Sequence, residues 1–210
     1  MSRTKSIIFI SGNGSNLQNI IDNVTNNFLK MDIAAVISNN AEAKGLARAK
    51  EAGIETMVID TSNKYVDKLL ILINTYHIDL ILLAGFMKIL PKDFTDKFYG
   101  KIINLHPSLL PKFKGLDTHK KVLASKEKYH GASVHFVTSK LDDGPVIIQG
   151  KTEILKNDNE ATLRDRVHKI EYNIFPLAIK WFIENHIKQV EGKCFFDNEE
   201  LKCPIEHLSD

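Results

Sequence analysis

The chain has 210 residues, and its 28 Lys and Arg residues against 26 Asp and Glu residues leave a formal net charge of +2. Hydrophobic residues make up 43% and charged residues 26%, an ordinary globular composition that excludes a disordered or fibrous protein. The small net charge gives no general signal for binding to nucleic acid or membranes. The sequence has no apolar run long enough for a transmembrane helix and no signal-peptide core, so we expect a cytoplasmic protein whose two cysteines, Cys194 and Cys203, are free thiols.

Charge is unevenly distributed along the chain. Between Ala84 and His130 there are ten lysines and four acidic residues, so this stretch carries +6 and the remainder carries −4. A solvated lysine surface is the simplest interpretation of such a stretch. The alternative is a surface that attracts anionic ligands, which requires a binding site nearby.

The first half of the chain alternates strand and helix patterns. The predicted strands are 6–10, 33–37, 56–59 and 79–84, and the predicted helices are 17–24, 41–52 and 65–76. Continuously apolar strands separated by helices are typical of a parallel sheet that is covered on both faces. We therefore predict an α/β fold with a doubly wound, mostly parallel sheet.

The second half has a different pattern, which predicts an antiparallel addition to the fold. The predicted elements are a strand at 102–105, a loop at 109–115, strands at 134–137 and 146–148 around a turn at 142–145, and a helix from about 159 to 185. Pro176 falls inside that helix, where proline often causes a kink. The predicted domain organisation is one domain over 1–190, with halves of about 1–100 and 101–190, followed by a C-terminal hairpin and tail at 191–210.

A glycine-rich turn, Ser-Gly-Asn-Gly-Ser-Asn at 11–16, separates the first strand from the first helix. Backbone N–H groups and the helix dipole make this position suitable for an anion, and Ser15 and Asn16 are able to cap the helix or to donate to a phosphate. Leu17 stands where a dinucleotide fingerprint needs glycine, and no Gly-Lys-Ser/Thr follows as in a P-loop. We favour a monophosphate site over a plain strand-to-helix turn with a serine cap.

Asn104 and His106 lie two residues apart at the end of a predicted strand, so their side chains point to the same side. Ligands bind at the carboxyl ends of parallel strands, and an amide beside an imidazole is able to stabilise an oxyanion. Asp142, in a later turn, would orient and charge the imidazole if the fold brought the two together. The spacing leaves open whether His106 is structural and whether Asp142 is an ordinary turn residue.

Four segments occur in one order along the chain: Ser-Gly-Asn-Gly-Ser-Asn-Leu at 11–17, Leu-Ala-Gly-Phe-Met-Lys-Ile-Leu at 83–90, Asn-Leu-His-Pro-Ser-Leu-Leu-Pro at 104–111 and Leu-Asp-Asp-Gly-Pro at 141–145. Together they resemble the glycinamide ribonucleotide formyltransferase family, from about Ile7 to Trp181. The middle motifs belong to the wider group of folate-dependent formyltransferases, and the glycine-rich turn points to the ribonucleotide enzymes. The resemblance implies a Rossmann-like formyltransferase fold with its antiparallel addition in the C-terminal half.

The resemblance also implies a reaction, in which the formyl group of 10-formyltetrahydrofolate moves to the amine of 5′-phosphoribosylglycinamide during purine synthesis, without a metal. The implied catalytic residues are Asn104, His106 and Asp142. The implied phosphate- and ribose-binding residues are Gly14, Ser15, Asn16, Leu17, Gln18 and Glu171. The implied folate-binding residues are Met87, Lys88, Ile89, Leu90, Asn104, Thr138, Ser139, Lys140, Leu141 and Asp142. We expect these small molecules as the only ligands, without nucleic acid or membrane, and a monomer or weak homodimer.

Two positions depart from the family pattern. Lys88 stands where arginine is common, and lysine lacks the planar fork that makes bidentate contacts. Asp143 stands where a small residue is common, and we expect it to face solvent. Lys112 and Lys114 either meet the glutamyl tail of the folate or are simply exposed.

Other polar residues have supporting roles in this interpretation. His119 and His135 match family motifs and are expected to pack near the site rather than to catalyse. Ser133 is a candidate for holding a water there. The histidines expected at the surface are His77, His130, His186 and His207.

Three alternatives are weighed against this function. Methionyl-tRNA formyltransferase carries an additional C-terminal RNA-binding domain, and formyltetrahydrofolate hydrolase carries an additional N-terminal regulatory domain; the length of this chain predicts neither. A non-catalytic nucleotide-binding module would use the glycine-rich turn alone. Leu17 and the presence of Asn104, His106 and Asp142 disfavour that module.

Overall fold

The computed structural model of the chain describes residues 3–61 and 65–207. By its internal contacts the chain divides into two compact units, residues 1–103 and residues 104–210. Among the described helices, none combines the length and the apolar character that crossing a membrane requires.

The first unit is built on parallel strands in the order β4-β1-β2-β3. The strands are β1 (Thr4–Ile10), β2 (Met31–Ser38), β3 (Glu55–Val58) and β4 (Leu80–Leu83). Ile7, Ile8, Phe9 and Ile10 are completely buried, as expected for a strand covered on both faces. β1 and β4 pair from Ser6 opposite Leu80 to Phe9 opposite Leu83, so both strands end at the same edge.

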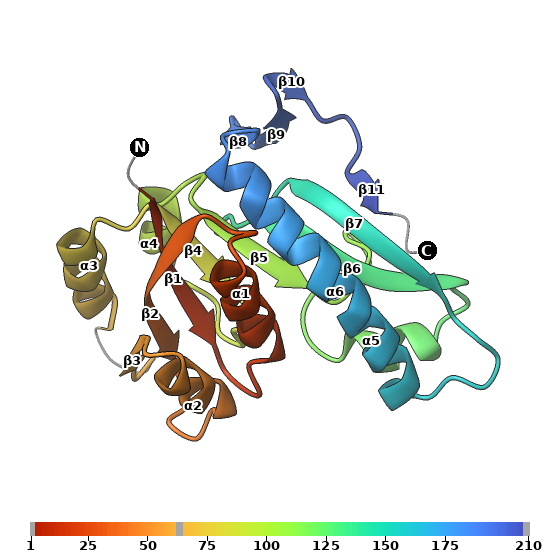
Figure 1. Ribbon diagram of the computed structural model, residues 1–210. Helices are drawn as coiled ribbons and strands as arrows, with labels where there is room; N and C mark the ends of the chain where they lie inside the picture. The colour runs from red at the N-terminus through yellow and green to blue at the C-terminus, as the bar shows by residue number, and fades with distance from the viewer. Residues whose placement is uncertain (1–2, 62–64, 208–210) are drawn as a thin grey trace. The chain divides into compact units, whose positions relative to one another are not determined.

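Helices cover both faces of these strands (Figure 1). α1 (Ser15–Thr25) and α2 (Lys44–Glu51) lie on one face, and α3 (Tyr65–Tyr76) lies on the other. After β1 the chain adds β2 and then β3 on one side of β1, and it then crosses back to place β4 on the other side. The strand order therefore reverses between β1 and β4. The loops that follow β1 and β4 start together there, and Ser11 N donates to Gly85 O at 3.1 Å.

The second unit holds strands in the order β11-β7-β6-β5 and a separate antiparallel sheet in the order β10-β9-β8. β6 and β7 are antiparallel, and β11 runs parallel to β7. The strands are β5 (Ile102–His106, which starts at the end of the first unit), β6 (Tyr129–Phe136), β7 (Val146–Glu153), β8 (Ile187–Val190), β9 (Lys193–Phe196), β10 (Glu199–Glu200) and β11 (Ile205–His207).

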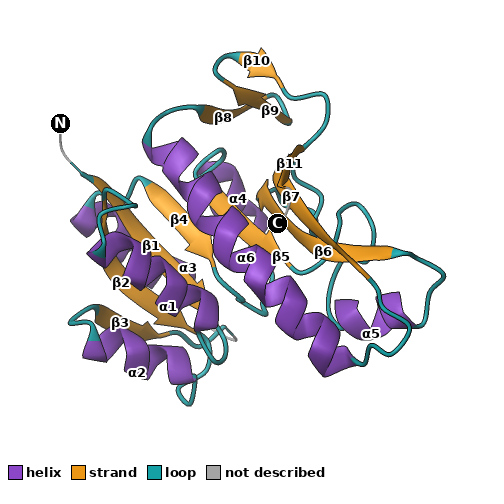
Figure 2. Ribbon diagram, turned by 45° about the vertical axis from the view of Figure 1, so that its right-hand side comes forward, coloured by secondary structure: helices purple, strands orange, loops and turns teal. Residues whose placement is uncertain are grey.

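A long helix, α6 (Glu160–Ile183), packs across β6 and β7 (Figure 2). It starts at a capping box, in which Asn159 Oδ1 accepts from Thr162 N and Thr162 Oγ1 accepts from Asn159 N, both at 3.0 Å. The helix continues through Pro176, which is buried. Gly150 of β7 allows the close approach of α6, because a Cβ there would lie 2.3 Å from Ile170 Cγ2.

The predicted fold class, a mostly parallel α/β sheet with an antiparallel addition in the C-terminal half, is confirmed. Two short helices have no clear apolar period and are absent from the prediction, α4 (Lys92–Lys97) and α5 (Thr118–Leu123). A C-terminal hairpin and tail are expected from the sequence at 191–210. The structure forms a hairpin from β8 and β9 that begins earlier, at Ile187, and within the expected tail β11 pairs with β7. The last three residues of that tail lie outside the described part of the chain.

Candidate active site

The glycine-rich turn after β1 is packed against the start of α2. Gly14 is the N-cap residue of α1 and has a φ of 72°, in the left-handed region. A Cβ at Gly14 would lie 2.5 Å from Gly45 Cα, well inside van der Waals contact. Gly45 N in turn donates to Gly12 O at 3.1 Å. Only glycine fits at position 14, because both the backbone conformation and the approach of α2 exclude a side chain.

The N-terminal end of α1 faces this turn without a side-chain cap. The first helical bond runs from Gln18 N to Gly14 O at 2.9 Å, and the alternative of a serine cap is wrong, since Ser15 is the first helical residue. Such an end presents N–H groups and the positive end of the helix dipole. Arg48 of α2 adds a positive charge, with Nε donating to Asn13 O at 3.0 Å. Sequence reasoning misses Arg48, because only the packing of α2 brings it to the turn.

The segment after β4 is tied to the same turn. Met87 N donates to Ser11 Oγ at 2.8 Å. Met87 and Ile89 are 60% and 65% exposed, Lys88 is exposed, and Leu90 is buried. Large exposed apolar side chains on a fixed loop are typical of a contact surface, here beside the glycine-rich turn in the first unit.

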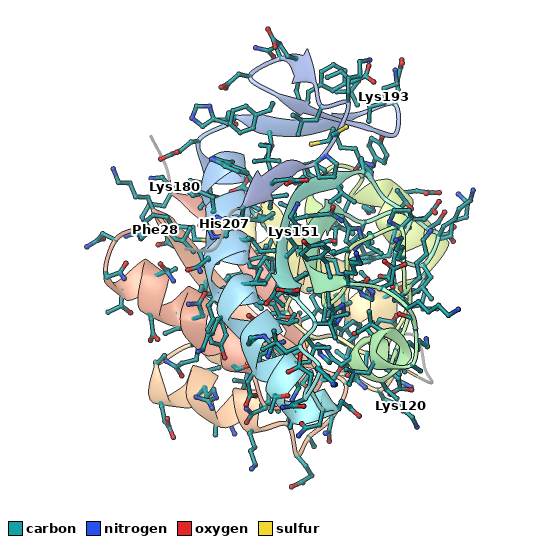
Figure 3. The ribbon with its side chains drawn as sticks, turned by 90° about the vertical axis from the view of Figure 1, so that its right-hand side faces the viewer. Phe28, Lys120, Lys151, Lys180, Lys193 and His207 are labelled. Carbon is teal, nitrogen blue, oxygen red and sulfur yellow. The ribbon has the colours of Figure 1, made fainter. Side chains whose placement is uncertain are left out.

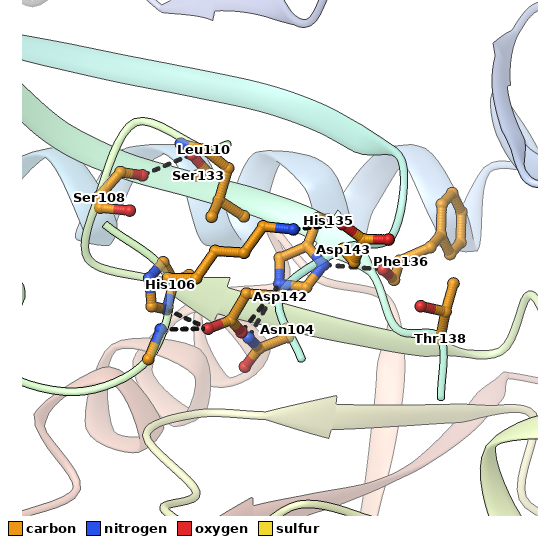
Figure 4. Close-up of polar contacts among 12 residues, drawn as sticks. Asn104, His106, Ser108, Leu110, Ser133, His135, Phe136, Thr138, Asp142 and Asp143 are labelled. Atoms are coloured by element: carbon orange, nitrogen blue, oxygen red, sulfur yellow. Dashed lines mark hydrogen bonds and ion pairs between the residues drawn. The ribbon is translucent and has the colours of Figure 1, made fainter. Parts of the chain in front are cut away.

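The second unit brings Asn104, His106 and Asp142 together (Figure 4). Asn104 and His106 project from the same side of β5, and Asp142 comes from the loop between β6 and β7. His106 Nδ1 lies 3.5 Å from Asp142 Oδ2, and the two side chains are only 7% and 9% exposed. The tertiary structure thus brings together an imidazole and a carboxylate that are far apart in sequence.

Main-chain groups of residues 113–115 contact the same pair. Phe113 O accepts a hydrogen bond from His106 Nε2 at 3.0 Å, and Gly115 N donates to Asp142 Oδ2 at 2.8 Å. Both groups that face the imidazole are therefore acceptors. A doubly protonated ring donates to both, whereas a neutral ring donates to one. These main-chain contacts have no signal in the sequence.

His135 of β6 contacts Asn104 and approaches Asp142. His135 Nδ1 donates to Phe136 O at 2.8 Å, which leaves Nε2 to accept from Asn104 Nδ2 at 3.0 Å. Nε2 also lies 3.8 Å from Asp142 Oδ1. Burial lowers the pKa of His135 to about 4, so the ring is neutral near pH 7. The tautomer of His135 thus fixes the direction of the Asn104 amide.

The prediction that Ser133 holds a water is wrong. Its Oγ accepts from Leu110 N at 3.0 Å and from Gln149 Nε2 at 2.8 Å, and it donates to Ser108 O at 2.6 Å. These three bonds use the hydrogen and both lone pairs of the hydroxyl. Ser133 instead anchors the loop that follows β5.

The prediction that His130 lies at the surface is also wrong. His130 is 1% exposed, because β6 starts earlier than the apolar pattern indicates. His119 Nδ1 and His130 Nε2 are 3.0 Å apart, and burial lowers the pKa of each ring to about 4. His77 is exposed as expected, whereas His186 and His207 are half-buried.

The other expected ligand-binding residues of this unit lie in α6 and in the loop before Asp142. Glu171 is 4% exposed in α6, where its Oε2 is 3.9 Å from His168 Nε2. In the loop, Lys140 N donates to Thr138 Oγ1 at 3.4 Å, and Ser139 and Lys140 are exposed. Leu141 is 50% exposed and gives this loop an apolar contact surface.

The two lysines of the 109–115 loop are paired with carboxylates. Lys112 Nζ donates to both carboxylate oxygens of Glu127, at 2.8 and 2.9 Å. Lys114 forms an ion pair with Asp143. Asp143 is exposed, in line with the expectation from sequence, but it is engaged by this lysine. Pairing partly neutralises both lysines, which weakens the view that they attract an anionic ligand.

The second unit also contains a cavity of about 320 Å³. It is lined by residues 109–113, by Gln149 and Lys151 of β7, and by Glu206 and His207 of β11. Lys151 and His207 lie on the side of the molecule that Figure 3 shows. Asn104, His106 and Asp142 do not line this cavity, but Phe113, whose carbonyl contacts His106, does.

Comparison with known proteins shows extensive similarity to one family. Residues 4–179 match the sequence model of the formyl transferase family. The chain is 44% identical to phosphoribosylglycinamide formyltransferase of Escherichia coli K12, over 93% of this chain and 94% of that protein. It is 40% identical to the Haemophilus influenzae enzyme of the same name, over 94% and 95%. A solved phosphoribosylglycinamide formyltransferase from Coxiella burnetii superposes with a TM-score of 0.91 at 40% identity, covering 98% of this chain and 99% of that one.

Proposed function

The chain belongs to the formyl transferase family, and we propose that it transfers the formyl group of 10-formyltetrahydrofolate to the amine of 5′-phosphoribosylglycinamide. The products are formylglycinamide ribonucleotide and tetrahydrofolate. Near full-length similarity to enzymes named for this activity supports the substrate pair. The observation that carries the chemistry is the group formed by Asn104, His106 and Asp142 in the second unit.

The proposed reaction starts when the substrate amine attacks the formyl carbon. A carbon–nitrogen bond forms, and the formyl oxygen becomes the oxyanion of a tetrahedral intermediate. Asn104 offers an N–H to this oxygen, since His135 accepts one hydrogen of the amide and leaves the other. A doubly protonated His106 adds a positive charge. The bond to the folate nitrogen then breaks, so no covalent bond to the protein is required.

Two proton transfers accompany the reaction. The attacking amine loses a proton, and the folate nitrogen gains one as it leaves. Asp142 is placed to take part, because its carboxylate lies beside His106 and accepts from Gly115 N. A water between Asp142 and His106 would relay the proton from one nitrogen to the other.

The proposal assigns ligand binding to each unit separately. In the first unit, residues 14–18 hold the substrate phosphate at the end of α1, and Arg48 contributes charge there. Residues 87–90 in the same unit contact the folate. In the second unit, Glu171 binds the ribose hydroxyls and residues 138–142 contact the folate. The proposal involves small molecules as ligands and a cytoplasmic monomer or weak homodimer, and no step uses a metal.

The test is an absorbance assay with 10-formyltetrahydrofolate and the ribonucleotide. Product should form only when both are present. Asp142→Asn should lower kcat by about 100- to 10,000-fold, because it removes the carboxylate that orients His106 and relays the proton. Asp165→Asn, at an exposed aspartate of α6, is the matched control and should keep normal turnover. Equal release of formate without the ribonucleotide would instead indicate a hydrolase, and normal turnover in folded Asp142→Asn would remove Asp142 from the mechanism.

A further inference from the structure

Three consecutive residues, Phe113, Lys114 and Gly115, contact three groups at the candidate active site. Phe113 O accepts from His106 Nε2, and Gly115 N donates to Asp142 Oδ2. Between these two main-chain contacts, the side chain of Lys114 pairs with Asp143, the residue next to Asp142. The alignment of His106 and Asp142 thus depends on where this short segment lies.

The backbone of the segment adopts conformations that need support. Phe113 has a φ of 54°, which is unfavourable for a residue with a large side chain, and Gly115 has a φ of 78°. On the opposite loop, Asp142 has a φ of 46°. Residues with a positive φ keep this conformation when surrounding contacts hold them. The 113–115 segment and the loop of Asp142 both contain such residues, and the ion pair of Lys114 and Asp143 joins them.

The ion pair is placed to provide this support. The side chains of Lys114 and Asp143 are 33% and 42% exposed, so the pair lies at the rim, outside the buried His106 and Asp142. The Lys114 ammonium lowers the pKa of the Asp143 carboxyl, which keeps the pair charged at neutral pH.

We propose that Lys114 and Asp143 are positioning residues, whose ion pair joins the 113–115 segment to the loop of Asp142 and so aligns the imidazole of His106 with the carboxylate of Asp142. Neither residue touches the reacting atoms in this proposal. The inference rests on the proposed formyl transfer and adds to it two residues outside the catalytic group. Loss of the pair would loosen both main-chain contacts while the buried core stays unchanged.

The experiment compares single and paired substitutions in the full-length enzyme. Lys114→Ala and Asp143→Ala should each lower kcat by about two- to fivefold, the range expected from a rim ion pair that acts through its neighbours. The charge swap, Lys114→Asp combined with Asp143→Lys, should recover most of the lost kcat. The KM values should change less than kcat. Lys151→Ala, which removes a lysine paired with Glu206 away from the site, should keep the wild-type kcat.

A second measurement follows His106 directly. The ring N–H signals of His106 in NMR spectra, identified by their absence in His106→Asn, should shift or broaden in Lys114→Ala and return in the charge swap. This measurement is independent of turnover, so it tests the positioning even if the wild-type enzyme transfers no formyl group. That failure of the wild type would refute the proposed function alone.

Three results would overturn the proposal. The first is an unchanged kcat in both alanine variants together with unchanged His106 signals. The second is a loss of kcat that the charge swap does not recover. The third is a rise in the folate KM alone, which would mean that Lys114 contacts the ligand and not the Asp142 loop.

Discussion

Gly14→Ala is the substitution for which the structure makes the sharpest quantitative prediction. Gly14 caps α1 with a φ of 72°, and its Cα faces the start of α2. Alanine adds a single methyl group, so it tests the backbone conformation and the helix approach without changing charge. The prediction is a less stable protein with weaker binding of the ribonucleotide.

The magnitude follows from two terms. A left-handed backbone costs a residue with a Cβ about 1–2 kcal/mol. The added methyl would also lie 2.5 Å from Gly45 Cα, so the starts of α1 and α2 must separate by about 1 Å to reach ordinary contact. Overpacking of this kind costs about 1–3 kcal/mol. The sum is a loss of roughly 2–5 kcal/mol in the free energy of unfolding, or about 4–20 °C in Tm for a chain of this size.

Thermal unfolding followed by circular dichroism measures this loss. Gly12→Ala is the matched control for stability, because no atom lies within 4 Å of a Cβ at Gly12 and its φ is not in the left-handed region. Its Tm should stay within about 2 °C of the wild type. For Gly14→Ala, the KM of the ribonucleotide should also rise, because a binding group displaced by 1 Å loses up to about 100-fold in rate or affinity.

An unchanged Tm in Gly14→Ala would refute the close approach of α1 and α2. A lowered Tm with an unchanged ribonucleotide KM would separate the two parts of the reasoning. That result would support the close packing of α1 against α2, and it would show that the end of α1 does not bind the substrate phosphate.

Two further predictions concern the second unit. Burial lowers the pKa of His119 and His130 to about 4, below the value of about 6.5 in an unfolded chain, so their contribution to stability is complete above pH 6.5 and is lost as the pH falls to 4. Urea unfolding between pH 7 and 5 should show stability falling with a limiting slope of about 1.4 kcal/mol per pH unit for each ring, and His130→Gln should flatten it; an identical slope in that variant would contradict the assignment. Ser133→Ala should lower the free energy of unfolding by about 1–3 kcal/mol, because it leaves Leu110 N without its acceptor and removes one acceptor of Gln149 Nε2. Ser125→Ala, at a residue of the loop after α5, should cost less than 1 kcal/mol in the same urea titration, and equal losses would show that the buried bonds of Ser133 contribute nothing special.

The strands of the first unit and its helices α1, α2 and α3 could be predicted well from the sequence. In a chain where strands alternate with helices, a continuous apolar run such as 6–10 is stable in the centre of a parallel sheet, where both faces of the strand are buried. Local patterns also placed Asn104 and His106 on one side of β5, because side chains alternate along any strand. The need for glycine at position 14 was foreseeable as a tight turn. Its second cause, the contact with Gly45, depends on how α2 packs.

Other features were decided by contacts between residues distant in sequence. The short helices α4 and α5 have too few apolar residues to show a period, and β11 is a strand only because β7 offers it an edge. From the sequence, His130 is expected at the surface and Ser133 is expected to bind a water. In the structure β6 includes both residues, and the loop after β5 hydrogen-bonds to Ser133. The sequence pattern does not indicate whether tertiary packing will bury a given polar side chain.

The sequence by itself determined the fold class, the identities of Asn104, His106 and Asp142 as candidates, and the family through the order of its motifs. Only the tertiary structure decided that Asp142 reaches His106, that His135 fixes the Asn104 amide, and that the main chain of 113–115 holds the pair. The physical reason is that local patterns report the periodicity and conformational preferences of single segments. The geometry of a site depends on backbone carbonyls and amides from several loops, which every residue possesses and which no pattern of side chains distinguishes.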